Sequence, residues 1–307
     1  MVPPREGVRT FPPSGLAKTE LVSPRTIAEA CDVLSRASVE GKRAVLLCGG
    51  TDWIVDRHLM APEKVKPVDT VIDLTKVAAL SSIGFHEVDG ARRMVLGGGV
   101  TYWSLRRDAR VLGTVPMLAT MARDVGAVQI QTRGTLAGNL ASASPAADGV
   151  PALMALDGIA VLTSTRGERR VPIDGFFTAY RKTVLEKDEI ITAIDLRIPS
   201  DGAIVTWRKV GTRLAQAISK VALAAVLERD ASGVVTRARF GMASVGPMTA
   251  PLRNVRTLLE GKPLASIDRL ALDAAVAKDV TPIDDVRSTG EYRIHVAKTL
   301  VWRALHP

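Results

Sequence analysis

The segment Thr132-Arg-Gly-Thr-Leu-Ala-Gly-Asn-Leu-Ala-Ser-Ala-Ser-Pro-Ala-Ala-Asp148 is the most unusual stretch of this chain, because it is long and consists mostly of small and polar residues. An apolar stretch from Leu118 to Val128 precedes it and predicts a helix. Inside a compact domain, a loop rich in Gly, Ser, Thr and Asn has backbone N–H groups that need partners, and a bound ligand usually supplies them. The segment therefore predicts a ligand-binding loop, although Ser144-Pro145 also has the pattern of an N-cap followed by the first helical residue.

A second glycine-rich turn lies upstream. Thr26 and Glu29 have capping-box spacing at the start of a helix predicted over about 26–37, and the apolar run 43–48 predicts a buried strand. The strand stops at Gly49-Gly50-Thr51-Asp52, whose backbone donors could surround a pyrophosphate. The turn matches neither a Walker loop nor a Rossmann fingerprint, and taken alone it is more typical of a tight turn with an Asp helix cap. Two such loops in one chain predict an extended dinucleotide between two units.

The remaining segments predict alternating strands and helices. Gly97-Gly98-Gly99 follows a strand at Met94–Leu96 and precedes Val100-Thr101-Tyr102-Trp103 in a region of short strands, so it predicts a bulge or turn rather than a third phosphate loop. Ser200-Asp-Gly202 predicts a boundary turn. Beyond it we expect a strand over 233–241 and a final helix over 292–305.

The composition excludes several classes of protein. The chain has 307 residues, 47% hydrophobic and 24% charged, which predicts a globular protein of two or three packed units. The charge of +9 comes from scattered Lys and Arg with only 4% aromatic residues, which favours a solvated surface or an acidic partner over nucleic acid. The sequence has neither an eighteen-residue apolar run nor a secretory signal, so we expect a cytoplasmic protein without a membrane span.

The reactive side chains suggest no catalytic or metal site. Cys31 and Cys48 are the only cysteines, too few for a disulfide framework or a four-cysteine iron–sulfur site. The four histidines lie far apart with no metal-binding spacing, and no nucleophile elbow exists. Hydrolysis therefore has no support in the sequence.

These motifs together resemble the FAD subunit of the molybdenum hydroxylases, the medium subunit of the xanthine dehydrogenase and carbon monoxide dehydrogenase family. The match runs in order from about residue 18 to the C-terminus and rests on Cys48–Asp52, Thr132–Asp148, Lys187–Ile191 before Ile198-Pro199, and Arg208–Arg213. The chain departs from the family pattern at Cys48, where bacterial relatives often have Ala, and at Ala137, where a second Gly often stands.

The resemblance implies an α+β fold. It comprises a vanillyl-alcohol-oxidase-type (PCMH-type) FAD-binding domain over 18–199, in two subdomains of about 18–67 and 68–199. A C-terminal domain of antiparallel sheet and helices follows over 200–307. Residues 1–17 are rich in Pro and Gly and show no period, which predicts an N-terminal arm. FAD is expected between the first two units.

The resemblance also implies which residues bind FAD, and it implies no catalytic or metal-binding residue. The residues from Leu46 to Asp52 would wrap the pyrophosphate. The residues of the 132–148 segment would hold the pyrophosphate and the ribityl or ribose groups. Ile191 matches a position near the adenine, and Lys209 one near the flavin. The expected contacts are Leu46, Leu47, Cys48, Gly49, Gly50, Thr51, Asp52, Thr135, Gly138, Asn139, Ser142, Asp148, Ile191 and Lys209.

In this family, electrons pass from a molybdopterin-binding large subunit through two [2Fe–2S] clusters of a small subunit to FAD, and then to an external acceptor. We therefore expect noncovalent FAD on this chain, molybdopterin and clusters on partner subunits only, and a dimer of heterotrimers. A self-contained FAD-dependent oxidase or dehydrogenase of the same fold is the alternative function. A nucleotide-binding module without redox activity and a nucleic-acid-binding protein are the other two alternatives.

Overall fold

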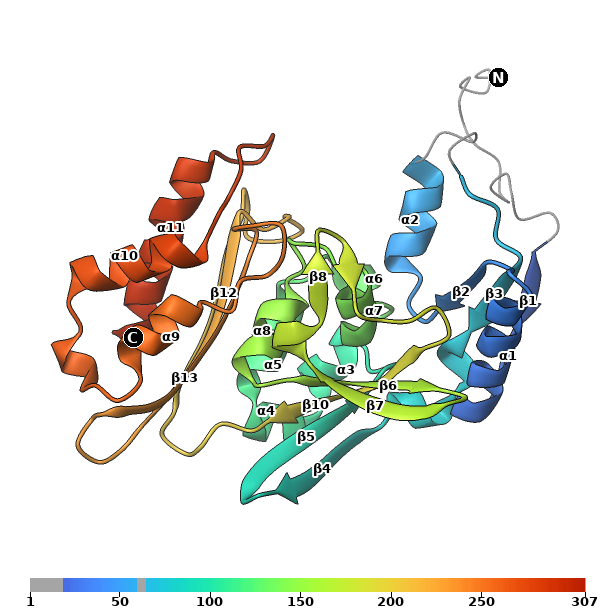
Figure 1. Cartoon of the computed structure of the whole chain (residues 1–307), viewed down its shortest axis with the longest axis horizontal. Coiled ribbons are helices and arrows are strands. Elements are labelled where there is room, and N and C mark those ends of the chain that lie inside the picture. The colour runs from blue at the N-terminus through green and yellow to red at the C-terminus, as the bar shows by residue number, and fades with distance from the viewer. Residues whose placement is uncertain (1–18, 60–64, 307) are drawn as a thin grey trace.

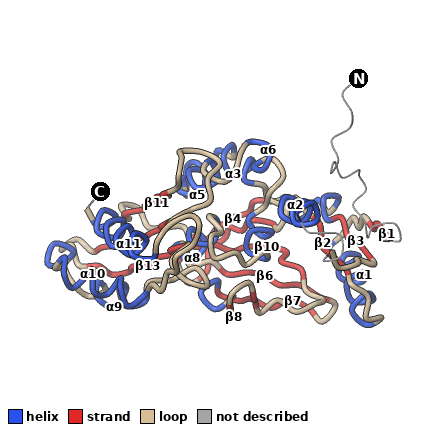
Figure 2. Tube along the Cα trace, turned by 90° about the horizontal axis from the view of Figure 1, so that it is seen from above, coloured by secondary structure: helices blue, strands red, loops and turns tan. Residues whose placement is uncertain are grey.

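The computed structural model describes residues 19–59 and 65–306, which form three principal β-sheets with their helices, placed along one long axis (Figure 1). A view at right angles shows the same succession of three groups (Figure 2). We call them the amino-terminal, central and carboxy-terminal sheets. The arm predicted over residues 1–17 lies outside the described residues. No helix among the described residues is long and apolar enough to cross a membrane.

The amino-terminal sheet is parallel and has the strand order β1-β3-β2. Its elements are β1 (Glu20–Val22), α1 (Ile27–Val39), β2 (Ala44–Leu47), α2 (Thr51–Leu59) and β3 (Thr70–Asp73). The predicted cap is present, since Thr26 Oγ1 accepts a hydrogen bond from the Glu29 N–H at 3.1 Å. The strand predicted at 43–48 is also present, but it is a half-buried edge strand because only β3 pairs with it.

The central sheet is antiparallel, with the order β4-β5-β10-β6-β7. Two short 3-10 helices lead into it, η2 (Leu74–Lys76) and η3 (Ala78–Ser81). Its strands are β4 (Ile83–Val88), β5 (Ala91–Gly97), β6 (Ile159–Ser164), β7 (Gly167–Pro172) and β10 (Ile190–Arg197). The 3-10 helix η4 (Ile173–Gly175) and a small hairpin, β8 (Phe177–Ala179) and β9 (Lys182–Thr183), separate β7 from β10.

Six helices follow β5 and precede β6 in the chain, and they lie on one side of the central sheet (Figure 1). They are α3 (Tyr102–Arg107), α4 (Ala109–Thr114), α5 (Pro116–Arg123), α6 (Val128–Gln131), α7 (Leu136–Ala141) and α8 (Gly149–Ala155). Leu118, Leu140 and Leu153 from these helices join Met94 and Leu96 of β5 in one buried apolar cluster. This packing holds α7, in the middle of the 132–148 segment, against the sheet.

The carboxy-terminal sheet is antiparallel and is covered on both faces. It contains β11 (Ile204–Val210), β12 (Val221–Arg229) and β13 (Val235–Ala243), with α9 (Arg253–Leu259), η5 (Leu264–Ser266), α10 (Arg269–Asp279) and α11 (Gly290–Leu305). Alternate residues of β12 belong to different clusters, because Leu223 packs with these helices and Ala224 packs with the central core. Helix α8 thus lies between the two sheets, where a Cβ at Gly241 would stand 2.4 Å from the Pro151 carbonyl oxygen.

The α+β class and the antiparallel carboxy-terminal sheet are confirmed, but the end of one predicted helix is wrong. The helix predicted over 118–128 ends at Arg123, because Gly126 has a φ of +52° and a new helix starts at Val128. After Gly99 the chain begins α3, with Thr101 as the N-cap.

The glycines at 97–99 form a close-packed turn, as predicted. The Val100 N–H donates to the Gly97 carbonyl at 2.9 Å, and a Cβ at Gly98 would stand 2.3 Å from the Ile191 carbonyl oxygen. These glycines therefore allow β5 and its turn to approach η3 and β10, which is a packing role.

Candidate functional site

The two glycine-rich loops that the sequence singled out touch each other. A Cβ built at Gly49 would lie 2.3 Å from the carbonyl oxygen of Arg133 and 3.0 Å from the Cα of Gly134. No side chain other than hydrogen fits there, because real Cβ atoms do not approach backbone atoms so closely. The two loops therefore meet through backbone, at the place where the sequence predicted a dinucleotide.

The upstream loop leaves backbone donors free at the start of α2. Gly50 has a φ of +71°, a conformation that side chains disfavour. The N–H groups of Gly49 and Gly50 donate to no oxygen of the described residues. The first N–H groups of any helix lack partners within it, and those of α2 begin at Thr51. Consecutive free N–H groups at a helix N-terminus suit a phosphate.

The other upstream residues support this turn. Leu46 and Cys48 are partly buried and pack on the apolar cluster of the amino-terminal sheet, and Leu47 lies beneath Gly50. Burial raises the pKa of the Cys48 thiol, and the Asp73 carboxylate raises it further. Asp52 is exposed in the first turn of α2.

In the 132–148 segment, several predicted ligand groups already have partners within the protein. Thr135 Oγ1 caps α7 by accepting the Gly138 N–H at 3.0 Å. Asn139 Oδ1 accepts the Gly149 N–H at 3.0 Å and so caps α8, and Ser142 Oγ donates to the Asn139 carbonyl at 2.9 Å. The helix start suggested at Ser144-Pro145 is wrong, because α8 begins at Gly149. What Gly138 leaves open is its exposed Cα side, which touches only Thr135 Oγ1.

Asp148 and Lys209 were predicted separately, and the structure brings them together. Lys209 Nζ donates to Asp148 Oδ2 at 2.5 Å and to the Asp124 carbonyl at 2.8 Å. Ser219 Oγ donates to Asp148 Oδ1. Burial raises the pKa of Asp148, while Lys209 and Ser219 oppose that shift. The pair joins α8 to β11, so the carboxy-terminal sheet contributes to the site.

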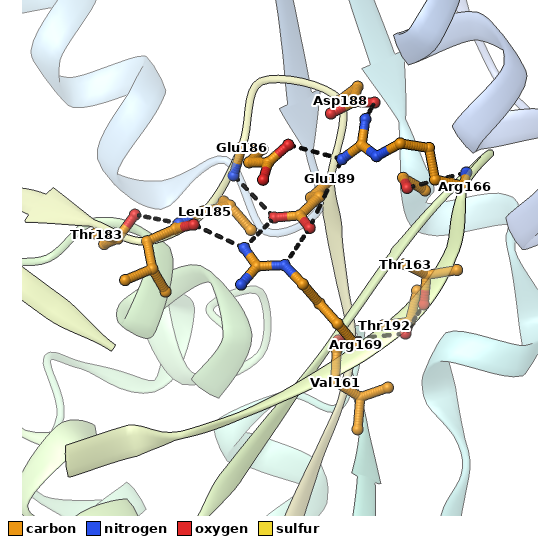
Figure 3. A network of polar contacts seen from close by, with 12 residues as sticks. Val161, Thr163, Arg166, Arg169, Thr183, Leu185, Glu186, Asp188, Glu189 and Thr192 are labelled. Atoms are coloured by element: carbon orange, nitrogen blue, oxygen red, sulfur yellow. Dashed lines mark hydrogen bonds and ion pairs between the residues drawn. The ribbon is translucent and has the colours of Figure 1, made fainter. Parts of the chain in front are cut away.

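Ile191 occupies a different environment from the loops. Its side chain is 7% exposed on β10 and belongs to the central apolar cluster together with Leu136 of α7. The segment before it is held by a polar network in which Arg169 donates to both oxygens of Glu189 at 2.5 and 2.7 Å (Figure 3). That hydrogen bonding outweighs burial and lowers the pKa of Glu189.

A cavity of about 630 Å³ opens beside this network, between the end of α1 and the segment 185–188. None of the predicted FAD contacts lines it. Its walls combine serine and threonine hydroxyls with Arg166, whose guanidinium is already paired with Glu186 and Asp188. This cavity is therefore separate from the predicted FAD contacts.

Tyr102 is the residue that sequence reasoning missed. Its side chain is 2% exposed, and its ring packs against Gly134. Its hydroxyl has no hydrogen-bond partner among the described residues. Burial raises the pKa of Tyr102 well above its usual value, and the charges of Asp148 and Asp52 add to the shift. The only signal in the sequence was its position just after the three glycines.

The polar groups that this site leaves free suit the binding of FAD. Free N–H groups at α2 can bind a pyrophosphate, and the open Cα surface of Gly138 allows close approach of a ligand. Asp148 can accept hydrogen bonds from ligand hydroxyls through lone pairs that Lys209 and Ser219 leave free. The unpartnered Tyr102 hydroxyl marks the same junction as polar and incomplete.

We expect Tyr102→Phe to leave the ligand-free chain at least as stable as wild type, because the change removes a buried hydroxyl that has no partner. Thermal melting of the FAD-free chain measures this directly. Tyr180→Phe is the matched control, since Tyr180 is 59% exposed and should change nothing. A loss of more than about 1 kcal/mol in Tyr102→Phe would show that the hydroxyl has a stabilising partner.

Comparisons with known proteins identify the family of the chain. Residues 17–201 match the family model described as the FAD binding domain in molybdopterin dehydrogenase, and residues 207–307 match the CO dehydrogenase flavoprotein C-terminal domain. The chain is 29% identical to the nicotinate dehydrogenase FAD-subunit of Eubacterium barkeri, over 80% of each chain. It is 27% identical to the carbon monoxide dehydrogenase medium chain of Hydrogenophaga pseudoflava, over 94% of this chain and 96% of that one.

A solved structure supports the same assignment. Carbon monoxide dehydrogenase from Hydrogenophaga pseudoflava superposes with a TM-score of 0.83 at 25% identity, covering 94% of this chain and 96% of that one. Quinoline 2-oxidoreductase from Pseudomonas putida, at 23% identity and a TM-score of 0.79, shares the fold. The sequence motifs had predicted this relationship, and the family models cover nearly the whole chain. The chain therefore belongs to the family of FAD-binding medium subunits of the molybdenum hydroxylases, as an oxidoreductase flavoprotein subunit.

Proposed function

We propose that this chain holds one noncovalent FAD between the amino-terminal and central sheets and works as the electron-transfer subunit of a molybdenum hydroxylase. The observation that carries the proposal is the backbone contact between Gly49 and Arg133, which brings two glycine-rich loops together around free N–H groups. The predicted FAD contacts are proposed as that site, and 18–199 and 200–307 as the domain limits.

Different residues of the chain would bind different parts of FAD. The N–H groups at Gly49 and Gly50 would bind the pyrophosphate, and Asp148 would accept hydrogen bonds from hydroxyls of the ribityl or ribose chain. Lys209 would place a positive charge near the flavin, which favours its reduced, anionic form. FAD, when bound, supplies the redox chemistry, and the chain supplies binding, orientation and charge.

We infer the partner subunits from the number of cysteines in the chain. Two cysteines cannot provide the four ligands of even one [2Fe–2S] cluster. We therefore propose a small subunit carrying the clusters and a large subunit carrying molybdopterin, joined to this chain in a dimer of heterotrimers. The cytoplasmic location stays a prediction.

We expect about one FAD per chain, all of it released when the yellow protein is denatured. Cys48 is the cysteine beside the loops, and its side chain packs with an apolar cluster and has a raised pKa, so it is a poor nucleophile for a flavin bond. The measurement compares flavin absorbance in the supernatant and in the precipitate. Colour that remains with the precipitated chain would disprove noncovalent binding.

Anaerobic mixing separates the subunit role from the alternative, a self-contained flavin oxidase. Reduced [2Fe–2S] subunit should bleach the flavin absorbance of this chain, and the chain alone should not oxidise small molecules at ordinary enzymatic rates. The partners should co-purify with the chain from its native cell. A free monomer that turns over a small substrate would replace the subunit proposal with the oxidase.

A further inference from the structure

Ser219 is a buried residue of the carboxy-terminal part of the chain that contacts the proposed FAD site. It lies two residues before β12 and is 0% exposed. Its hydroxyl donates to Asp148 Oδ1, 71 residues away in sequence. Because Asp148 precedes α8, this bond crosses from the central sheet's helices to the carboxy-terminal sheet.

The two oxygens of Asp148 have different partners. Oδ2 accepts from Lys209 Nζ, and Lys209 is held in turn by the carbonyl of Asp124. Asp124 is itself fixed, because its Oδ2 accepts the Trp207 indole N–H at 2.9 Å. Oδ1 accepts from Ser219. Two donors from two strand ends therefore set both the position and the rotation of one carboxylate.

The Asp148 side chain does not cap α8, although its position at the start of that helix suggests this role. It stands at the N-cap of α8 but makes no capping hydrogen bond. Asn139 caps the helix instead, through the Gly149 N–H. The carboxylate is thus turned away from its own helix and held by the carboxy-terminal sheet, which a purely local helix cap does not require.

We propose that Ser219 is a positioning residue for FAD, acting through Asp148. By holding Oδ1, it fixes the carboxylate plane so that the remaining lone pairs face the cofactor hydroxyls. FAD binding is thereby linked to the contact between the central and carboxy-terminal sheets. This inference rests on the proposed function, since it refines the same site.

The test measures FAD affinity in a double-mutant cycle on the full chain with FAD removed and added back. Ser219→Ala should weaken FAD binding about tenfold, the effect of one hydrogen bond to a charged group. On an Asp148→Ala background, the same change should alter the affinity less than about twofold, because its target is gone. Ser164→Ala is the matched control, a buried serine on β6 whose hydroxyl accepts the Arg166 N–H.

A second measurement does not need the Asp148 variant to fold. At one fixed FAD concentration, the FAD-induced rise in melting temperature should be smaller in Ser219→Ala than in wild type, and unchanged in Ser164→Ala. A purely structural serine would lower the melting temperature of the FAD-free chain and leave that rise intact. Equal FAD affinity in wild type and Ser219→Ala, or equal effects on both backgrounds, overturns the inference. If wild type binds no FAD, it is the proposed function that fails.

Discussion

Gly49→Ala is expected to abolish stoichiometric FAD binding. The new Cβ would stand 2.3 Å from the Arg133 oxygen and 2.8 Å from its carbonyl carbon, both backbone atoms that no rotamer change can move. The two loops must separate, so at least two hydrogen bonds to the charged pyrophosphate are lost. At about 1.5–3 kcal/mol each, affinity should fall at least a hundredfold.

The measurement is the flavin-to-protein ratio of the purified variant, followed by titration with added FAD. Gly113→Ala is the matched control, because a Cβ there on α4 meets nothing within 4 Å. It should keep its FAD and stabilise the helix slightly. A Gly49→Ala protein that retains one FAD per chain would show that the loop contact is not the binding site.

Lys209→Ala should destabilise the chain by about 3–5 kcal/mol near neutral pH, because it leaves the Asp148 carboxylate buried without its counter-charge. Denaturant unfolding of the FAD-free chain measures the change in the free energy of unfolding. Lys187→Ala removes an exposed lysine and is the control, with an expected change below about 0.5 kcal/mol.

The deficit of Lys209→Ala should shrink as the pH falls. The folded pKa of Asp148 is already raised by burial, and removing Lys209 removes a group that lowers it. The folded state then holds its proton more tightly than the unfolded state, whose Asp pKa is about 3.9. The free energy of unfolding of the variant therefore decreases as pH rises from that value to the folded pKa, and levels off above it. A deficit that does not become smaller as the pH falls toward about 3.9, the usual pKa of an unfolded Asp, would contradict this assignment.

Much of the fold was readable from local sequence. The Thr26–Glu29 cap, the apolar run before Gly49 and the turn at Gly202 are signals between near neighbours, and each appears where it was predicted. The helix expected over 118–128 was misjudged because the left-handed Gly126 interrupts a stretch whose apolar pattern looks continuous.

The candidate site was readable only as two loops with a family resemblance. The residue types at 49–52 and 132–148 indicate close backbone approach, since glycine removes the steric barrier and small polar residues satisfy a ligand. The sequence did not show which of these polar groups remain free to bind a ligand. The Asn139 side chain serves α8, and the Gly138 N–H serves the cap of α7.

The sequence by itself determined the fold class, the family and the two loops, because each depends on spacing within a short window. The tertiary structure alone decided that Gly49 touches Arg133, that Asp148 pairs with Lys209, and that Tyr102 lies at their junction. These partners are separated by many residues along the chain, and packing of the central sheet against its two neighbours brings them within reach. No local pattern encodes such distances, since they depend on how all the buried side chains fill the space between the sheets.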